Sequence, residues 1–184
     1  SLARGEQVKT EKPLSKEWIN AEVLRLSTAK DTSGLLSYAN YLLSYIEQKK
    51  PDTTLISDLY YYIGVCNLLS NQYEDAILNL KNSLSLKEFL QSEDENYLKG
   101  IYNIGVSYNF LGDYFQVSDY MNKYIRLSSK LSGEENPEIA AAYSALIGAA
   151  IQNRDFDNFT DYTFRILGIL SKNKDAITGD DLSR

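Results

Sequence analysis

The chain has 184 residues, and 43% of them are hydrophobic, which suffices for one ordinary domain or a short solenoid with a continuous core. Its net charge of −6 argues against nucleic-acid binding, because that affinity comes largely from Lys and Arg side chains that release counterions from phosphates. The longest apolar run, around Ile139 to Ile151, is interrupted by Ser144, whereas a membrane-spanning helix needs about 20 consecutive apolar residues. We therefore expect no nucleic-acid partner and no membrane insertion within this chain.

The residue types needed for common catalytic and metal sites are missing. The sequence contains no histidine and a single cysteine, Cys66, which excludes Ser-His-Asp and Cys-His nucleophile sites and HExxH zinc sites. Carboxylates cluster at 93–95, 134–135 and 180–181, in consecutive loop positions that lack the alternation of a calcium loop and the fixed cleft of a glycosidase. We expect a protein that is not an enzyme and needs no metal or cofactor, with Cys66 acting as a small buried hydrophobe.

Helix start and stop signals alternate along the chain. Residues 1–14 are polar and mixed in charge, and we expect a frayed lead-in there. Ser15 can cap a first helix, the polar break at 30–33 supplies the next cap, and Pro51 stops the second helix. Residues 173–184 form a polar tail or begin a further repeat. Between these ends the pattern predicts a solenoid over 15–172, made of four helical hairpins at about 15–50, 52–91, 94–132 and 136–172.

The hairpins repeat at intervals of 41 or 42 residues. Tyr61, Tyr102 and Tyr143 lie 41 residues apart, and polar-polar-aromatic turn signals recur at 71–73, 112–114 and 154–156. A repeat of this length is typical of a solenoid, in which no single unit can bury its own apolar face and neighbours must stack. The sequence therefore predicts an all-α solenoid without strands.

Each unit resembles a tetratricopeptide repeat. The middle unit matches best, with Ile101, the pair Ile104-Gly105 and Tyr108 in the first helix and the turn at 112–114, and Ala76 opens the second helix of the unit before it. The long period is similar to that of kinesin light chains and of bacterial repeat arrays attached to signalling or protease domains. In the last unit, Leu146 and Phe159 replace small residues. The resemblance covers about 15–172 and implies a right-handed superhelix.

In proteins of this type the first helix of each pair lines a concave groove that holds a peptide, so the resemblance implies a partner-binding site there. Tyr61, Tyr102 and Tyr143 fall at the place that points into the groove, and stacked units would align them as a ladder. The expected groove residues are Tyr61, Val65, Lys99, Tyr102, Asn103, Val106, Tyr143 and Ile147. The alternative is that the tyrosines fill space between adjacent first helices.

The function implied is a non-enzymatic module that binds a protein or peptide of extended or helical form. Some proteins of this type use lysine, asparagine and arginine side chains in the groove to grip the terminal carboxylate of a partner. Most of these residues are absent here, so we do not expect binding of a terminal carboxylate. The alternative function is a regulatory or scaffolding segment of a larger signalling, sensor or protease protein, with the groove occupied by another part of the same polypeptide.

Overall fold

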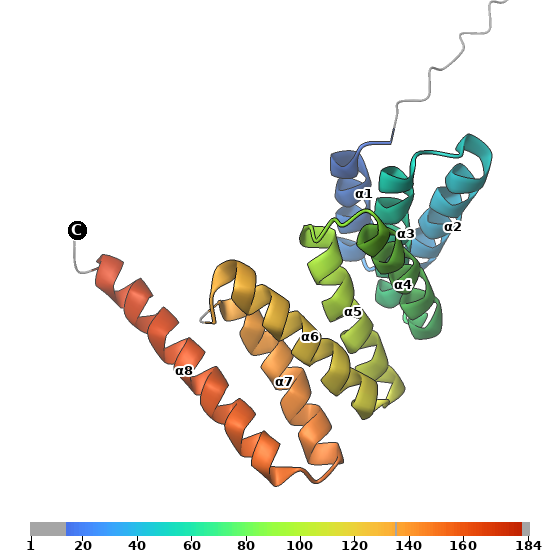
Figure 1. Cartoon of the computed structure of the whole chain (residues 1–184). Coiled ribbons are helices and arrows are strands. Elements are labelled where there is room, and N and C mark those ends of the chain that lie inside the picture. The colour runs from blue at the N-terminus through green and yellow to red at the C-terminus, as the bar shows by residue number, and fades with distance from the viewer. Residues whose placement is uncertain (1–13, 135, 182–184) are drawn as a thin grey trace, which may run out of the picture.

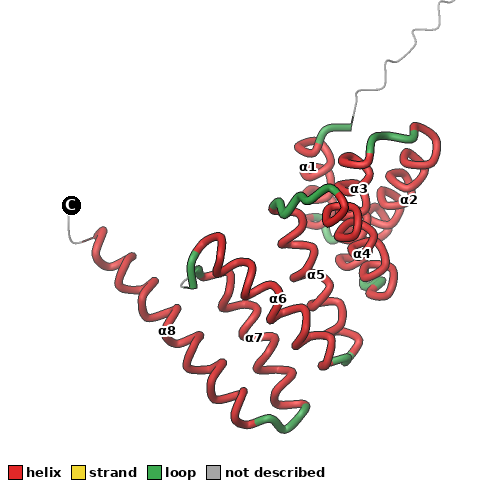
Figure 2. Tube along the Cα trace, viewed as in Figure 1, coloured by secondary structure: helices red, strands yellow, loops and turns green. Residues whose placement is uncertain are grey.

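The computed structural model describes residues 14–134 and 136–181, and every regular element in this part of the chain is an α-helix (Figure 2). The eight helices of the described residues are α1 (Lys16–Thr28), α2 (Thr32–Lys49), α3 (Thr53–Leu69), α4 (Tyr73–Phe89), α5 (Glu95–Leu111), α6 (Tyr114–Ser132), α7 (Pro137–Gln152) and α8 (Phe156–Asp181). They form four consecutive hairpins that stack into an extended array (Figure 1). The predicted all-α solenoid is confirmed.

Short polar side chains start most of the helices. The side-chain oxygen of each cap accepts a hydrogen bond from a backbone N–H in the first turn, which satisfies a donor that has no partner within the helix. The capping residues are Ser15, Asp31, Asp52, Asp94, Asp113 and Asn136. After Asn136, Pro137 occupies the first helical position, where its missing N–H has no consequence.

The turns fix the register of the repeat. One or two residues after the first helix of each hairpin, the backbone has a positive φ, at Lys30 (54°), Asn71 (62°), Gly112 (76°) and Arg154 (57°). The turns between hairpins also contain a residue with a positive φ, at Lys50 (47°), Gln91 (53°) and Gly133 (86°). Successive intervals are therefore 41, 41 and 42 residues in the first series, and 41 and 42 in the second.

The extra residue lies in α6 or directly after it. Asn71 and Gln91 are 20 positions apart, whereas the equivalent Gly112 and Gly133 are 21 apart. All of α7 and α8 is therefore displaced by one residue from a strict 41-residue period. One residue turns a position by about 100° around a helix, so the displacement changes which side chains face a given surface.

The first helices of the hairpins form one wall of the solenoid. Each of α1, α3 and α5 contacts the next first helix, whereas the second helices contact only their neighbours in sequence within the described residues. The first helices therefore lie closer together and form the inner side of the curve. Two crossings inside the hairpins are especially close: a Cβ added at Gly64 would lie 2.6 Å from Cγ of Leu80, and one added at Gly105 would lie 2.8 Å from Cε of Met121.

Both ends differ from a simple repeat. Leu14 is buried against the core, and the rest of the expected lead-in lies outside the described residues. At the other end, α8 continues to Asp181, beyond the expected end at residue 172. None of the described helices combines the length and apolar character needed to cross a bilayer.

Candidate functional site

A hollow of about 360 Å³ lies on the inner wall, where α3, α5 and α7 meet. We call it the inner hollow. It is lined by Tyr61 of α3, by Lys99, Tyr102 and Asn103 of α5, by Tyr124 of α6, and by Glu138 and Ala141 of α7. Four of the eight groove residues expected from the sequence are thus brought together: Tyr61, Lys99, Tyr102 and Asn103.

The three tyrosines of the inner hollow differ in exposure. Tyr61 is only 7% exposed, its ring meets that of Tyr62 edge-on at 5.2 Å, and burial raises the pKa of its phenol. Tyr102 is partly buried, with its ring centroid 5.2 Å from that of Tyr124. Tyr61 therefore fills space between first helices, whereas Tyr102 lies at the surface of the hollow with its ring packed on that of Tyr124, which is only 5% exposed.

The polar side chains around this pair carry both signs of charge. Lys99 is exposed and forms an ion pair with Glu95 one turn earlier on α5, and Glu138 is exposed at the start of α7. Asn103 is partly buried, and its amide can both donate and accept hydrogen bonds. The arrangement suits a ligand with apolar groups and backbone-like amides better than one with a concentrated charge.

Three of the other expected groove residues lie outside the lining of this hollow. Val65 and Val106 are partly buried and pack against the hydrophobic core. Ile147 is also partly buried. Val65 and Val106 therefore support the helices of the inner wall.

Tyr143 does not join Tyr61 and Tyr102. It is 8% exposed and lies in a second hollow, of about 650 Å³, between α6 and α8. Its ring centroid is 5.8 Å from that of Tyr162, and the guanidinium carbon of Arg165 lies 5.9 Å from the ring. The predicted alignment of three tyrosines in one ladder is therefore wrong at its last position.

The extra residue before α7 explains why Tyr143 does not lie with Tyr61 and Tyr102. Counted from the turns, the position equivalent to Tyr102 is Ser144, which is exposed. The position equivalent to Tyr143 is Ile101, whose side chain is fully buried in the core. Tyr143 thus takes a core position that is about 100° around the helix from the groove position.

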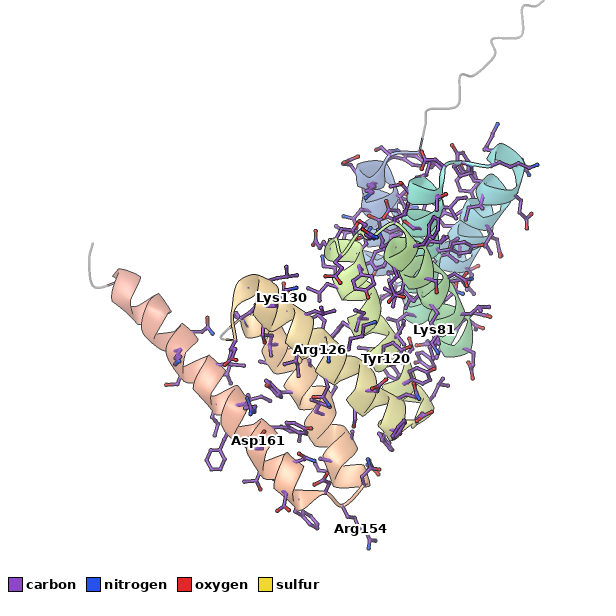
Figure 3. The ribbon with its side chains drawn as sticks, in the orientation of Figure 1. Lys81, Tyr120, Arg126, Lys130, Arg154 and Asp161 are labelled. Carbon is purple, nitrogen blue, oxygen red and sulfur yellow. The ribbon has the colours of Figure 1, made fainter. Side chains whose placement is uncertain are left out.

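The hollow between α6 and α8, which we call the outer hollow, is more strongly charged than the inner one. Arg126, Arg165 and Lys172 line it together with Glu134 and Asp161. Figure 3 labels Arg126 on α6 and Asp161 on α8, the two helices that flank the outer hollow. Asp161 accepts a hydrogen bond from Arg165 at 2.8 Å, so one of these cations is already neutralised.

Four helices meet at a buried ion-pair network that sequence reasoning missed. The Nζ atom of Lys87 lies 2.8 Å from Oδ1 of Asp58 and 2.7 Å from Oδ2 of Asp94. Asn96 donates to Oδ1 of Asp58 at 3.0 Å, and Nζ of Lys16 lies 2.6 Å from Oδ2. Asp58 and Lys87 are 0% and 1% exposed. The network joins α1, α3, α4 and the start of α5, and so it fixes three hairpins against one another.

Hydrogen bonds keep the carboxylate of Asp58, at the centre of the network, in its charged form. Burial alone would raise the pKa of Asp58, but hydrogen bonds from Lys16, Lys87 and Asn96 outweigh it and hold that pKa below its ordinary value. Asp58 is therefore ionised at neutral pH. A satisfied carboxylate of this kind stabilises structure and is not available as a general acid or base.

The described residues hold no group of three or more acidic or cysteine side chains that could bind a metal ion. Cys66 is fully buried, and burial raises the pKa of its thiol to about 12, so the thiol stays protonated. The residues of the inner hollow that sequence reasoning missed are Tyr124, Glu138 and Ala141. Counting from the turn signals, instead of from the tyrosines, would have indicated Ala141, which is the counterpart of Lys99.

A comparison with protein-family models finds no match, and neither does a comparison with curated proteins. Among solved structures, the fold is similar to the crystal structure of BtubC (BKLC) from P. vanneervenii, with a TM-score of 0.71 and 17% sequence identity. The match covers 85% of this chain and 62% of BtubC, so this chain spans less than two thirds of the length of BtubC. The likeness shows the fold alone, and it confirms the expected tetratricopeptide-like repeat array.

Proposed function

We propose that this chain is a non-enzymatic scaffold that binds a segment of another protein along its inner wall, over the inner hollow. The observation that carries the proposal is the grouping of Tyr102, Tyr124 and Asn103 around one hollow on the side where the first helices meet. The alternative use of the same wall, by another part of the same polypeptide, involves the same side chains.

The chemistry of the inner hollow indicates what the bound segment contains. Tyr102, held in place by the buried ring of Tyr124, offers aromatic surface for an apolar or aromatic anchor, because rings of this kind give large contact areas at low entropic cost. Asn103 can satisfy one backbone amide group of the segment. Lys99 and Glu138 stand at the rim, where charges affect orientation and association rate more than affinity.

A rigid wall favours binding, since less ordering is needed when the partner arrives. Two kinds of contact hold the helices of the inner wall in place. The close crossings of Gly64 on Leu80 and of Gly105 on Met121 set the spacing inside the hairpins. The Asp58–Lys87 network sets the spacing between hairpins.

Selection from a phage-displayed library of random peptides, with the folded chain as the target, tests the proposal. Selected peptides would be labelled with fluorescein, and their affinity would be measured by polarisation. We expect Tyr102→Ala and Asn103→Ala each to weaken binding by about 1 kcal/mol or more, which is roughly fivefold. Tyr41→Ala is the control, because Tyr41 is a 49% exposed tyrosine on α2, away from the hollow. Peptides that bind both hollow variants as tightly as the wild type would refute the site.

A further inference from the structure

A hollow of about 530 Å³ lies between the second helices α2 and α4, with residues of α3 between them. It shares no residue with the inner hollow or the outer hollow. Its lining differs from both, because it carries five primary amides and a single charged group, Asp75. We call it the amide hollow, and its amides belong to Asn40 of α2, Asn67 of α3, Gln72 just before α4, and Asn79 and Asn82 of α4.

The side chain of Asn67 is buried without a hydrogen-bond partner. Asn67 is 8% exposed, and among the described residues no group donates to its amide or accepts from it. Asn79 is also 8% exposed, and its nitrogen donates to the backbone oxygen of Asp75 at 2.8 Å, which leaves its side-chain oxygen as an acceptor. A buried amide without a partner costs stability that an apolar side chain of similar size would not cost. The amide of Asn67 on the wall of a hollow therefore indicates a ligand that supplies the missing hydrogen bonds.

The next repeat shows the same place closed by side chains of the protein itself. Three of the amides have larger counterparts at the 41-residue interval of the turns: Lys81 for Asn40, Tyr108 for Asn67 and Tyr120 for Asn79. The Nζ atom of Lys81 donates to the hydroxyl of Tyr108 at 2.9 Å and lies 5.8 Å from the ring centroid of Tyr120. The two ring centroids are 5.7 Å apart, and Figure 3 labels Lys81 on α4 and Tyr120 on α6. These three side chains satisfy one another, whereas the shorter amides leave the space between α2 and α4 open.

The amide hollow also offers apolar surface at its rim. Leu78 is 58% exposed there, and Tyr60 is partly buried beside it in the lining. In the closed copy, the residue equivalent to Leu78 is the exposed Asp119. The open copy thus combines unpaired amides with an apolar side chain at a place where the closed copy has a charge.

The amides extend over the length of a short segment of chain. Gln72 and Asn82 both line the hollow and are ten residues apart, which corresponds to about 15 Å along α4. That length matches roughly four to five residues of an extended chain. Asn40 contributes an amide from the opposite wall, on α2.

We propose that the amide hollow binds an extended, largely uncharged segment of another protein. Each residue of such a segment except proline presents one N–H and one C=O group, and a primary amide can donate to one and accept from the other. An apolar side chain of the segment packs against Leu78 and Tyr60. Asp75, as the one charge of the lining, favours a basic residue at its end of the segment. A carbohydrate also offers hydrogen-bonding groups, but it carries no apolar side chain for Leu78.

Subtractive selection from a phage-displayed library of random peptides tests the proposal. The library is first depleted on the Asn67→Leu chain and then selected on the wild-type chain, so that only peptides that need Asn67 are kept. We expect such peptides, and we expect their fluorescein-labelled copies to bind Asn67→Leu and Asn40→Ala about fivefold or more weakly than the wild type. Asn109→Leu is the matched control, because Asn109 is an exposed asparagine of α5 outside the amide hollow. Tyr102→Ala, in the inner hollow, should leave the affinity of these peptides unchanged, so the two sites can fail separately.

Thermal unfolding shows whether Asn67→Leu acts through the fold. Leucine has a similar size and no unpaired amide, so the Tm should stay the same or rise. A Tm that falls by several degrees would mean that the amide makes structural hydrogen bonds, and it would overturn the proposal. Asn40 is exposed, so Asn40→Ala leaves the fold intact and tests the hollow a second time.

Three binding results would also overturn the proposal. The first is a depleted library that yields no peptide for the wild-type chain. The second is a set of peptides that bind Asn40→Ala as tightly as the wild type. The third is binding to a glycan array that depends on Asn67 in the absence of any selected peptide, which would assign the amide hollow to a carbohydrate.

Discussion

The ammonium group of Lys87 lies 2.8 Å from the carboxylate of Asp58 at a place where both side chains are almost completely removed from solvent. Burying two charges costs more than their attraction returns unless further hydrogen bonds satisfy them. Asp94, Asn96 and Lys16 supply those bonds. The Asp58–Lys87 pair therefore contributes more to the relative placement of the first three hairpins than to their stability.

Replacing Lys87 with methionine should destabilise the fold strongly, because Asp58 is left buried with too little compensation. We expect a loss of about 3 to 5 kcal/mol in the free energy of unfolding, measured by urea denaturation. The double variant Lys87→Met with Asp58→Leu should lose less than Lys87→Met alone, since neither charge is then buried. A double variant that is less stable than the single one would contradict this explanation.

The pKa of Asp58 predicts how its contribution depends on pH. Because this pKa is lowered in the folded state, the stabilisation is present above the ordinary carboxylate pKa, about 3.9. It is lost as the pH falls below that value and through the pKa of the folded state. The difference in unfolding free energy between the wild type and Asp58→Asn should therefore shrink as the pH falls below about 4. A difference that stays constant down to pH 2, roughly two units lower, would show that the charge of Asp58 is not responsible.

A side chain at Gly105 must displace Met121, because a Cβ there would lie 2.8 Å from Cε of Met121. Gly105→Leu should cost about 1 to 3 kcal/mol in thermal or urea unfolding, through overpacking at the helix crossing. Gly148→Ala is the matched control, since a Cβ at Gly148 meets no atom within 4 Å. In the interior of α7 that change should raise stability by about 0.5 to 1 kcal/mol. Equal stability of the two variants would contradict the packing described for the crossing.

The register of the last hairpin can be tested with adjacent residues. Tyr143→Ala removes a buried ring from contact with Tyr162 and should cost about 3 to 5 kcal/mol. Ser144→Ala changes an exposed position on the next residue, and its effect should stay within about 0.5 kcal/mol. If both variants unfold like the wild type, Tyr143 is not a core residue and the 42-residue interval has been misplaced.

The sequence predicts the helices of this chain well, because caps, apolar stripes and turn residues all indicate the same elements. Gly105 and the turn at 112–114 also indicate the correct kind of repeat. Tyr143 shows where this reasoning fails. The added residue in or after α6 shows in the sequence only as the 42-residue spacing of the last two turn signals, and the tyrosine match at 41 residues conceals it.

The ion-pair network could not be predicted in the same way. Asp58 and Lys87 are 29 residues apart on different helices, and each of them alone is typical of a solvated helix face. Only the stacking of three hairpins brings Lys16 and Asp94 to the same place. Half of the expected groove residues line the inner hollow because the first two of the three tyrosine positions keep the 41-residue interval.

The central claim is that partners bind over the inner hollow, and photo-crosslinking tests it most directly. Benzoylphenylalanine would replace Tyr102 in one variant and Tyr41 in another, and each would be irradiated with a peptide selected from the library. The account predicts a covalent adduct at position 102 and little or none at position 41. Adducts at position 41 with none at position 102 would place the partner elsewhere on the solenoid and contradict the account.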